Sequence, residues 1–477
     1  MTRVWQLAVS LGVAAALPAL LPHVLLSRKR RRTVLGRLTL SGLPRPAAGP
    51  RAGRIWVHAL SVGETVSAVP LVRAMGERFP DRTIHFSAST ETGFAEARRL
   101  LEDIVSECFL FPYDLPVPLR RVWNRVDPGM VVLVETDIWP GFLGEAEARS
   151  IPVVLVNTRL SDRSFAGYRR FSGIMGSVLR KFARICPQTD ADVRRFRALG
   201  VSPDRIVRTG NIKFDSIAGT PDAAERATLR KRLGLEPSRR ILVAGSTHEG
   251  EEAMLAAAFR TLIEPGLRAP RDRESAPALV IAPRAPDRAE AVRRIFAKSS
   301  RGRSVGAGDV PHPPAGGNLA VRTLAETEAG AAADVIVVDR IGVLRSLYAL
   351  GEMAFVGGSL VPRGGHNPLE PAACGVPVLF GPHMHDFREI ARMLLDAGGA
   401  KTVDSAAALA SAAGDWLRDP ERARRAGERA RTVFLENRGA VDRTLDALAG
   451  LLPPLPPEGA EAKRRPSVSP SDLPRIR

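Results

Sequence analysis

Carboxylates that directly follow apolar, strand-like runs are the residues best placed for acid–base chemistry in this chain. Glu64 comes after the run Arg54–Leu60 and the turn Ser61–Gly63. A carboxylate within hydrogen-bond reach of a hydroxyl group can act as a general base. The same position also falls in the first turn of an expected helix, where a carboxylate only complements the helix dipole. The sequence therefore makes Glu64 a candidate base and leaves the dipole role open.

Two further charged stretches have a similar placement. Glu135 and Asp137 follow the apolar run Met130–Val134, and two carboxylates this close could form an acid–base pair or cap the next helix. Lys213 stands in the polar turn Gly210–Asp215, near the expected junction between two domains. Its ammonium group could neutralise an anionic leaving group or simply be solvated. The sequence leaves both alternatives open for each stretch.

The stretch Met353–Phe380 has the pattern of an anion-binding unit, with a short apolar strand, a glycine-rich turn, a helix and another strand. The turn is Arg363–His366. Asn367, Pro368 and Glu370 then fit a helix N-cap, the first helical position and the partner in a capping box. Free N–H groups and the dipole at a helix start favour bound anions. We therefore predict a phosphate or nucleotide site here, with a well-capped structural helix as the alternative.

The segment His248–Glu252 superficially resembles a zinc-binding helix. Glu252, however, stands where the second histidine is required. The three glutamates of this segment suit the first turn of a helix instead. Ser246 and Thr247, which precede it, could donate to a phosphate. We therefore expect no metal at this segment.

Alternating strands and helices must position these side chains. Such alternation predicts parallel sheets with helices on both faces, and ligands then bind beyond the carboxyl ends of the strands. Pro283 and Arg284 follow one of the strands and place a cation at this edge or on the surface. The expected architecture is two Rossmann-like α/β halves with a cleft between them. The expected strands are Arg54–Leu60, Thr83–Ser87, Glu107–Phe111, Met130–Val134, Pro152–Val156 and Arg184–Pro187 in the first half, and Arg240–Ala244, Ala278–Ala282, Val335–Val338, Met353–Val356 and Val376–Phe380 in the second.

The charge balance points to an anionic partner. The chain of 477 residues has 69 Lys and Arg against 51 Asp and Glu, a net charge of +18, and a pI near 10.9. Nucleic acid, an anionic membrane and an anionic substrate all suit this balance. We expect no nucleic acid, because the chain has only three Tyr, no recognisable nucleic-acid motif, and basic residues spread over many helices. Three distant cysteines imply no disulfide framework.

The amino terminus has the composition of a membrane anchor. The 23 residues Val4–Leu26 contain no charged side chain, and a spanning helix needs roughly 20 apolar residues. The basic cluster Arg28–Arg32 follows at once, which places the rest of the chain on the cytoplasmic side. Pro18, Pro22 and His23 leave open an anchor that lies in the membrane interface. A cleaved signal peptide is the third alternative.

Together these residues resemble the 3-deoxy-D-manno-octulosonic acid (Kdo) transferases, the membrane-associated enzymes of lipopolysaccharide assembly. The similarity extends over about residues 54–390. The motifs that carry it, in the order of the family, are WVHALSVGE (56–64), ETDIWP (135–140), NTRLSDRS (157–164), GNIKFD (210–215), STHEGEE (246–252) and GGSLVPRGGHNPLEPAACGVPVLFGPH (357–383).

The resemblance implies an inverting, metal-independent glycosyltransferase of the GT-B fold, without a cofactor. Its donor would be CMP-Kdo and its acceptor a hydroxyl group of the lipid A precursor, lipid IVA. Glu64 would be the general base, and Glu135 and Lys213 would support the transition state. The CMP contacts carried over are Pro283, Arg284, Ile341, Gly342, Val343, Asn367, Pro368, Leu369 and Glu370.

Two positions depart from the family pattern. Ala285 stands where the family usually has histidine, and Val343 stands where it has a carboxylate. At Ile341–Val343 we therefore expect the backbone around Gly342, and not the side chains, to contact CMP.

The implied domain organisation has five parts, and the enzyme would lie at the cell inner membrane with its catalytic domains on the cytoplasmic face. The expected parts are a membrane anchor at 1–27, a basic linker at 28–53, an acceptor-binding domain at 54–216, a CMP-sugar-binding domain at 217–450 and a disordered, Pro-rich tail at 451–477. Two other functions stay open. One is a GT-B transferase or epimerase that uses a UDP-sugar, and the other is a non-catalytic membrane protein that binds anionic lipid.

Overall fold

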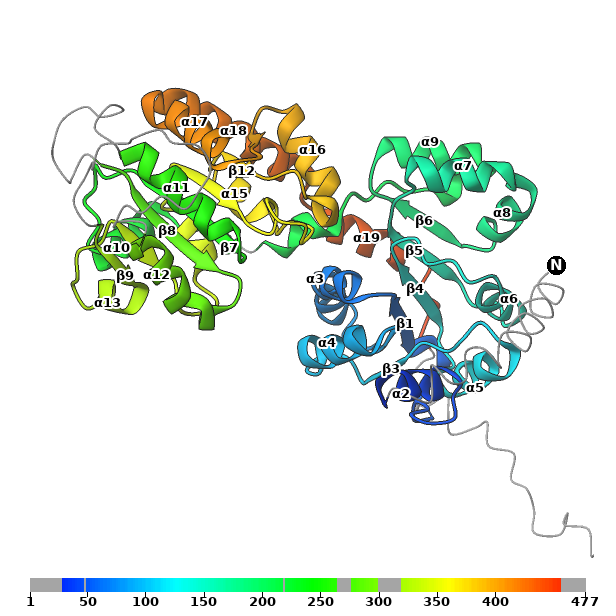
Figure 1. Ribbon diagram of the computed structural model, residues 1–477. Helices are drawn as coiled ribbons and strands as arrows, with labels where there is room; N and C mark the ends of the chain where they lie inside the picture. Colours follow the sequence, from blue (N-terminus) through cyan, green and yellow to red (C-terminus); the bar gives the residue numbers. More distant parts are fainter. Residues whose placement is uncertain (1–27, 47–48, 218, 264–275, 299–318, 456–477) are drawn as a thin grey trace, which may run out of the picture. The chain divides into compact units, whose positions relative to one another are not determined.

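The chain folds into two α/β units, each built on one parallel sheet (Figure 1). The computed structural model describes residues 28–46, 49–217, 219–263, 276–298 and 319–455. The first unit comprises Met1–Ser216 together with Arg438–Arg477, and the second comprises Ile217–Asn437. The prediction of two parallel-sheet α/β domains is confirmed.

The sheet of the first unit has the strand order β3-β2-β1-β4-β5-β6. The order reverses between β1 and β4, and in such sheets the crevice at this reversal is where ligands bind. Glu64 lies beyond the end of β1 and Glu135 directly follows β4, so both candidates stand at this point. The strands are β1 (Arg54–Ala59), β2 (Thr83–Ala88), β3 (Glu107–Leu110), β4 (Met130–Val134), β5 (Val153–Thr158) and β6 (Arg184–Pro187).

Helices cover both faces of this sheet and enclose two apolar cores (Figure 1). Ile55 and Val57 of β1 point into the core beneath α3 and α4. Trp56 points to the opposite face, where its ring meets Trp123 edge-on at 5.3 Å. The helices are α2 (Arg28–Arg37), α3 (Val62–Arg78), α4 (Glu91–Leu101), α5 (Pro116–Val126), α6 (Pro140–Ala148), α7 (Asp162–Arg170), α8 (Ser172–Leu179), α9 (Asp190–Ala198) and α19 (Ala440–Ala449).

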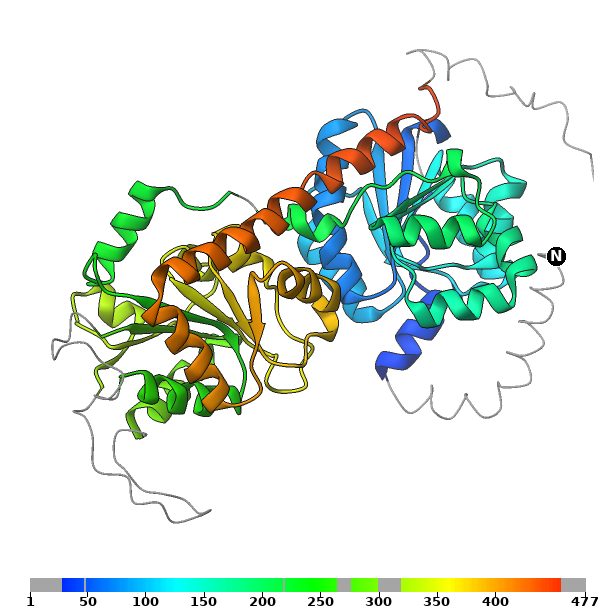
Figure 2. The ribbon, with the colours of Figure 1, turned by 90° about the horizontal axis from the view of Figure 1, so that it is seen from above.

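The carboxyl-terminal helix α19, red in Figure 2, belongs to the first unit and packs against α3. Leu445 and Leu448 of α19 are buried in the core that α3 covers. Asp215 caps the helix, since its two carboxylate oxygens accept hydrogen bonds from the N–H groups of Gly439 and Val441, each at 2.7 Å. The second domain therefore ends earlier than the sequence-based boundary at residue 450, because residues 438–450 belong to the first unit.

The sheet of the second unit has the order β13-β12-β11-β7-β8-β10-β9. Here β7 lies between β11 and β8, so the chain reverses direction across the sheet at β7, and this is again the edge where ligands are expected. The strands are β7 (Ile241–Thr247), β8 (Ala278–Pro283), β9 (Val321–Thr323), β10 (Val335–Val337), β11 (Met353–Val356), β12 (Val378–Phe380) and β13 (Ala400–Thr402).

Nine α-helices in the described part of the second unit, with short 3-10 turns, surround this sheet. They are α10 (Ala223–Arg232), α11 (Glu251–Ile263), α12 (Ala289–Lys298), α13 (Leu324–Glu328), α14 (Leu344–Tyr348), α15 (Leu369–Ala373), α16 (Arg388–Asp396), α17 (Ala406–Arg418) and α18 (Pro420–Asn437). The 3-10 turns used below are η3 (Ile212–Ser216) in the first unit and η5 (Pro286–Arg288) and η6 (His385–Phe387) in the second.

The segment predicted as a basic linker begins with helix α2. Arginine is a good helix former, and the side chain of Arg37 anchors the helix end by donating to the carbonyl of Phe111 at 3.0 Å. Among the residues that the structure describes, no helix combines the length and apolar character needed to span a membrane. The predicted anchor Val4–Leu26 and residues 456–477 of the predicted tail lie outside the described residues. The start of the predicted disordered tail is ordered instead, because Leu451 and Leu452 pack against the core of the first unit.

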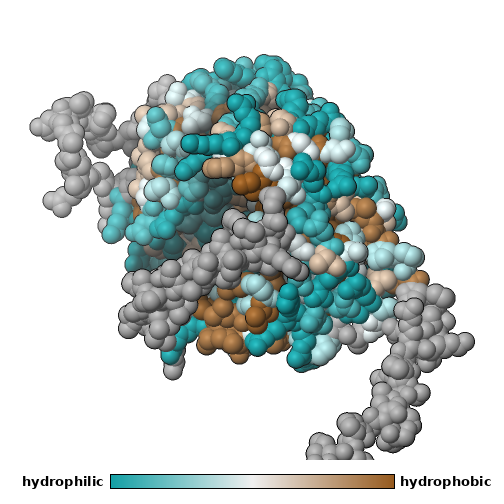
Figure 3. All heavy atoms as spheres, turned by 90° about the vertical axis from the view of Figure 1, so that its right-hand side faces the viewer, coloured by the Kyte–Doolittle hydropathy of each residue, from teal (hydrophilic) through white to brown (hydrophobic). Residues whose placement is uncertain are grey.

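Hydrophilic side chains cover much of the face in Figure 3, and apolar side chains gather in areas between them. Large apolar side chains that are at least half exposed in the first unit include Leu40, Val117, Phe171 and Ile174. Single exposed apolar residues are normal on protein surfaces.

Candidate active site

Glu64 lies in the first turn of α3, beyond the end of β1. Ser61 is the N-cap of this helix, and its hydroxyl accepts a hydrogen bond from the N–H of Glu64 at 3.4 Å. In return, the Glu64 carboxylate accepts the N–H of Leu60 at 2.6 Å. This reciprocal arrangement is close to a capping box. The residue is half-buried, and these two hydrogen bonds hold it in place.

The environment of Glu64 raises the pKa of its carboxyl group to about 7. Loss of solvent around the half-buried group is the largest cause, and the negative charges of Glu135 and Asp137 add to it. The hydrogen bond from Leu60 offsets part of the rise. A general base is most effective when its pKa lies near the working pH. Glu64 is therefore suited to accept a proton at neutral pH.

Glu135 adopts an uncommon backbone conformation directly after β4. Its φ angle is +62°, in the left-handed region that side chains other than glycine rarely occupy. Its N–H donates to the carbonyl of Val156 at 2.8 Å, and the neighbouring Thr136 hydroxyl bonds the carbonyl of Arg159 at 2.6 Å. Strain of this kind costs about 1–3 kcal/mol and is typical of functional sites. The turn brings Glu135 close enough to Glu64 to raise the pKa of its carboxyl group.

Asp137 is buried against His58, a residue that the sequence analysis did not single out. The Nε2 atom of His58 lies 2.9 Å from an Asp137 carboxylate oxygen, and its Nδ1 atom lies 3.0 Å from the hydroxyl oxygen of Ser87. The ring stacks on Phe111 with centroids 3.8 Å apart. Asp137 thus ties the turn after β4 to β1 and positions Glu135. The sequence signals for His58 were its polarity within a mostly apolar strand and its place in the motif WVHALSVGE.

Lys213 lies in η3, which packs against α3. Asn157 holds this turn, because its side-chain oxygen accepts the N–H of Ile212 at 3.1 Å. Asn157 is fully buried and, like Glu135, has a positive φ, +53°. The structure therefore brings Glu64 and Glu135 together and places the half-buried Lys213 on a neighbouring turn of the same unit.

In the second unit, a buried carboxylate organises the loop after β11. Glu251 is fully buried, and its oxygens accept the N–H groups of Gly358 at 2.7 Å, of Ser359 and Leu360 at 2.9 Å each, and of His248 at 2.9 Å. The sequence analysis gave Glu251 only a role at the helix dipole. Three of its four partners are backbone groups 107 to 109 residues further along the chain, which no local pattern reveals.

Two histidines meet where β7 and β11 end. The Nε2 atoms of His248 and His366 lie 2.8 Å apart, and the two rings are parallel to within 1° with centroids 5.1 Å apart. Arg284, which directly follows β8, is exposed, and its charge acts on both rings. Its N–H donates to the carbonyl of Thr247 at 2.9 Å. The predicted cation at the strand edge therefore lies near the glycine-rich loop Arg363–His366.

The predicted capping box between Asn367 and Glu370 is wrong. The helix α15 begins at Leu369 rather than Pro368, and the Asn367 side chain instead accepts the N–H of Leu369 at 3.1 Å. The reason is that the loop continues the strand hydrogen bonding to His366, whose N–H donates to the carbonyl of Gly357 at 3.1 Å. Glu370 is half-buried, and burial raises the pKa of its carboxyl group while Arg345 opposes the rise.

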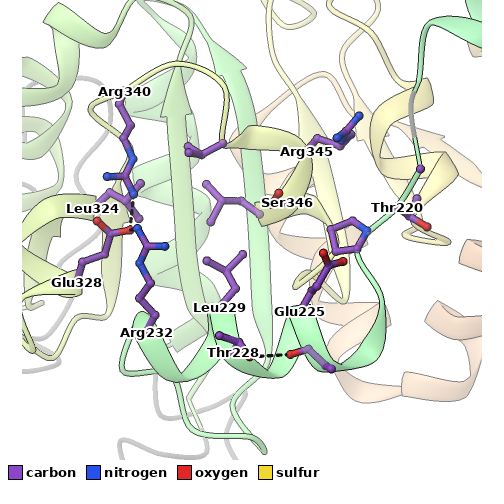
Figure 4. Close-up of a pocket in the computed structure, with 15 residues that line it drawn as sticks. Thr220, Glu225, Thr228, Leu229, Arg232, Leu324, Glu328, Arg340, Arg345 and Ser346 are labelled. Atoms are coloured by element: carbon purple, nitrogen blue, oxygen red, sulfur yellow. Dashed lines mark hydrogen bonds and ion pairs between the residues drawn. The ribbon is translucent and has the colours of Figure 1, made fainter.

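The residues Ile341–Val343 follow β10 on the same edge of the sheet. Ile341 is 82% exposed and Gly342 has φ +90°, with open space around its α-carbon. Val343 borders a cavity of about 750 Å³ in the second unit (Figure 4). In this cavity Arg232 and Arg340 both point to the carboxylate of Glu328. Of the predicted CMP contacts, only Val343 lines this cavity.

Among the described residues, no group of three or more His, Cys, Asp or Glu side chains is arranged to hold a metal ion. His248 pairs with a histidine, and Glu252 lies with Arg288, with a distance of 3.4 Å between carboxylate oxygen and guanidinium nitrogen. In this structure His248 and Glu252 thus have different partners.

A family model and several known proteins match this chain. The model of the 3-deoxy-D-manno-octulosonic-acid transferase (kdotransferase) family matches residues 2–216. The 3-deoxy-D-manno-octulosonic acid transferase of Haemophilus influenzae is 33% identical over 405 residues, 84% of this chain and 88% of that protein. The enzyme of the same name from Bordetella pertussis is 34% identical over 417 residues, again 84% of this chain and 88% of that protein.

The fold also matches a solved structure of low sequence identity. The UDP-GlcNAc 2-epimerase of Neisseria meningitidis, bound to UDP-GlcNAc, aligns with 83% of this chain and 100% of its own, with a TM-score of 0.51 and 11% identity. At this identity the match shows the fold alone, two parallel-sheet α/β domains of the kind found in GT-B glycosyltransferases.

Proposed function

Since the chain belongs to the 3-deoxy-D-manno-octulosonic-acid (Kdo) transferase family of glycosyltransferases, we propose that it transfers Kdo from CMP-Kdo to a lipid A precursor. The acceptor group is a hydroxyl of lipid IVA, and the product serves the assembly of the lipopolysaccharide core. Transfer inverts the configuration at the sugar carbon and uses no metal ion or cofactor.

The observation that carries this proposal is the state of Glu64, a half-buried carboxyl group with a pKa of about 7 at the strand-order reversal of the first sheet. In the reaction, Glu64 takes the proton of the acceptor hydroxyl, whose oxygen forms a bond to the anomeric carbon of Kdo. The bond from that carbon to the phosphate oxygen breaks, and its electron pair leaves with CMP. A single base is sufficient for such an inverting displacement.

Glu135 and Lys213 support the charges that develop in this step. The transition state has oxocarbenium character, so the carboxylate of Glu135 beside Glu64 stabilises positive charge on the sugar ring. Lys213 stabilises the negative charge of the phosphate as it leaves. His58 and Asp137 act as positioning residues, because their contact fixes the turn that carries Glu135.

The second unit supplies the donor site. CMP-Kdo carries two anionic groups, the phosphodiester and the sugar carboxylate, and guanidinium groups form strong, directed hydrogen bonds with such oxygens. Arg284 and Arg363 are exposed cations at the carboxyl edge of this sheet. Glu370 takes no part in capping its helix, which leaves its carboxylate to accept hydrogen bonds from the ribose hydroxyls. The backbone around Gly342 contacts the base.

The site of action is the cytoplasmic face of the inner membrane, where the acceptor lipid is found. The apolar segment Val4–Leu26 and the basic residues after it support this location. Each Lys or Arg close to an anionic membrane surface contributes about 1 kcal/mol of attraction.

The test is a donor selection with the full chain. Purified protein is incubated with lipid IVA and either CMP-Kdo or a set of UDP-sugars, and the mass of the lipid is measured. A mass increase of Kdo with CMP-Kdo alone supports the proposal. Transfer from a UDP-sugar, or binding of lipid without any change in its mass, would refute it.

A further inference from the structure

The His248–His366 pair has no role in the chemistry described so far, although it lies at the edge of the sheet where the donor is expected. His248 directly follows β7 and His366 closes the glycine-rich loop after β11, so neighbouring strands deliver the two rings. The Nε2 atoms are 2.8 Å apart, the usual length of a strong hydrogen bond. The two rings therefore share one proton between them.

This sharing limits the protonation states of the pair. In the neutral pair, one ring donates its Nε2–H, so its Nδ1 is an acceptor, and the other ring carries its proton on Nδ1. In the singly protonated pair, both Nδ1 atoms carry a proton. Two protons cannot both lie between nitrogens 2.8 Å apart, so a second positive charge is excluded. The pair therefore presents one donor and one acceptor when neutral, and two donors when it holds a positive charge.

Charged groups on several surrounding elements decide which state the free protein adopts. Burial is the largest cause that lowers the pKa of both imidazoles, to about 4 for His366. The charge of Arg284 lowers both further, His248 also lowers the pKa of His366, and Glu251 opposes the fall at His248. At neutral pH the free pair is consequently uncharged. The charged groups that act on the pair are Arg284 after β8, Arg288 in η5, Arg363 in the loop after β11, and Glu251 in α11. Asp386 of η6 packs against Gly364 of the loop. Glu249 and Glu252 lie close to Arg288.

The backbone holds both rings in place. Glu251 accepts the N–H of His248 and, with the same carboxylate oxygen, the N–H of Gly358 at the end of β11. The N–H of His366 donates to the carbonyl of Gly357, and the N–H of Gly365 donates to the carbonyl of Gly358. The ends of β7 and β11 thus fix the backbone positions from which the two rings extend.

We propose that the His248–His366 pair binds an anionic oxygen of the donor phosphate and takes up one proton from solvent as it does so. The inference rests on the proposed function, since it takes CMP-Kdo as the donor. The negative charge of the phosphate favours the singly protonated pair, in which either ring can present an Nδ1–H to the oxygen. The same charge also offsets the arginines that keep the free pair neutral.

The same proton assists the reaction. Before transfer, the phosphate of the donor is a diester with one negative charge, and CMP leaves as a monoester that carries up to two. A positively charged pair interacts more strongly with the monoester than with the diester. Interactions that strengthen on the way to the transition state are the ones that raise the rate. The pair is thus a second contributor to leaving-group departure, beside Lys213.

The sign of the pH dependence follows from the direction of the change. Binding raises the pKa of the pair, so the extra affinity for CMP is fully present below the free-state pKa and is lost as pH rises through the bound-state pKa. This linkage weakens CMP binding by up to about tenfold for each unit by which the pH rises above the bound-state pKa. The titration of CMP itself adds a further pH dependence that is common to every variant.

The test is calorimetry of CMP binding to the full chain at pH 7, in two buffers that differ in their enthalpy of ionisation. The difference in heat between the buffers gives the number of protons taken up. His366→Gln and His248→Gln each replace one imidazole of the pair by a side chain that can form hydrogen bonds but does not titrate. His385→Gln, at an exposed position in the same unit, is the matched control.

On CMP binding, the unmodified chain and the His385→Gln protein should take up more protons than either pair variant. The difference should be a fraction of a proton and never more than one. The weakening of CMP binding with rising pH should be smaller in the pair variants than in the unmodified chain. Equal proton uptake in all four proteins would overturn the proposal. If only one of the two pair variants folds, the measurement on that variant is sufficient. Absence of CMP binding to the unmodified chain would instead refute the donor assignment, and the inference with it.

Discussion

Removing the charge of Glu135 should move the pH profile of the enzyme, because that charge acts directly on the proposed base. Glu64 has a pKa of about 7, against an ordinary value of 4.5, and Glu135 is the second largest cause of this rise after burial. The Glu135→Gln substitution keeps the size of the side chain and removes its charge. The pKa of Glu64 should then fall by about one unit, and burial should keep it above 4.5.

The assay is kcat/KM for Kdo transfer measured from pH 5 to pH 9. Glu64 is active when deprotonated, so activity should rise with pH through the pKa of the free enzyme. We expect the midpoint of this rise near pH 7 in the unmodified protein and about one unit lower in Glu135→Gln, whatever the loss in maximal rate. Glu102→Gln, an exposed carboxyl of the same unit, should leave the midpoint unchanged.

Either of two results would refute this reasoning. A midpoint that stays in place when Glu135 loses its charge would mean that the two carboxylates do not interact in the working enzyme. A midpoint near 4.5 in the unmodified protein would mean that Glu64 is solvated like an ordinary glutamate.

Three other perturbations have defined outcomes. Glu370→Ala should raise KM for CMP-Kdo more than KM for the lipid and leave the melting temperature unchanged, since Glu370 does not cap its helix; equal KM effects with a lower melting temperature would favour a structural role. Glu251→Ala leaves four backbone N–H groups without their acceptor, at about 1–3 kcal/mol for each buried donor, so it should lower the melting temperature and weaken CMP binding, whereas the exposed Glu249→Ala should do neither. Deleting residues 1–27 should reduce the membrane-bound fraction and transfer to lipid in vesicles while leaving CMP affinity intact, and an unchanged fraction after membrane fractionation would contradict the anchor.

The sequence predicted the central strands well, because a strand covered on both faces needs a continuous apolar run. The run Met130–Val134 is an example, and its bounds agree with β4. The edge strands β9 and β13 were missed. Each has only three residues, of which one is buried, and so short a segment shows no recognisable pattern. The helix α2 was missed because its arginine-rich sequence has no apolar face.

The candidate site likewise contains residues that the sequence identified and residues that it missed. Glu64 and Glu135 were identifiable because they follow strands, and the position after a parallel strand is a local property of the sequence. The roles of His58 and Glu251 depend on partners 79 and 107 residues away, Asp137 and Gly358 respectively. Such contacts arise only when the sheets assemble, so no spacing rule along the chain reveals them.

The measurement that tests the central claim most directly is a single turnover with Glu64→Gln. A glutamine side chain still offers an oxygen to the N–H of Leu60, so the start of α3 is retained while the base is lost. We predict that this variant binds CMP as the unmodified protein does and transfers Kdo from CMP-Kdo to lipid IVA about 10²–10⁴-fold more slowly. Transfer at the unmodified rate, with the lipid gaining the same mass in the same time, would contradict the account.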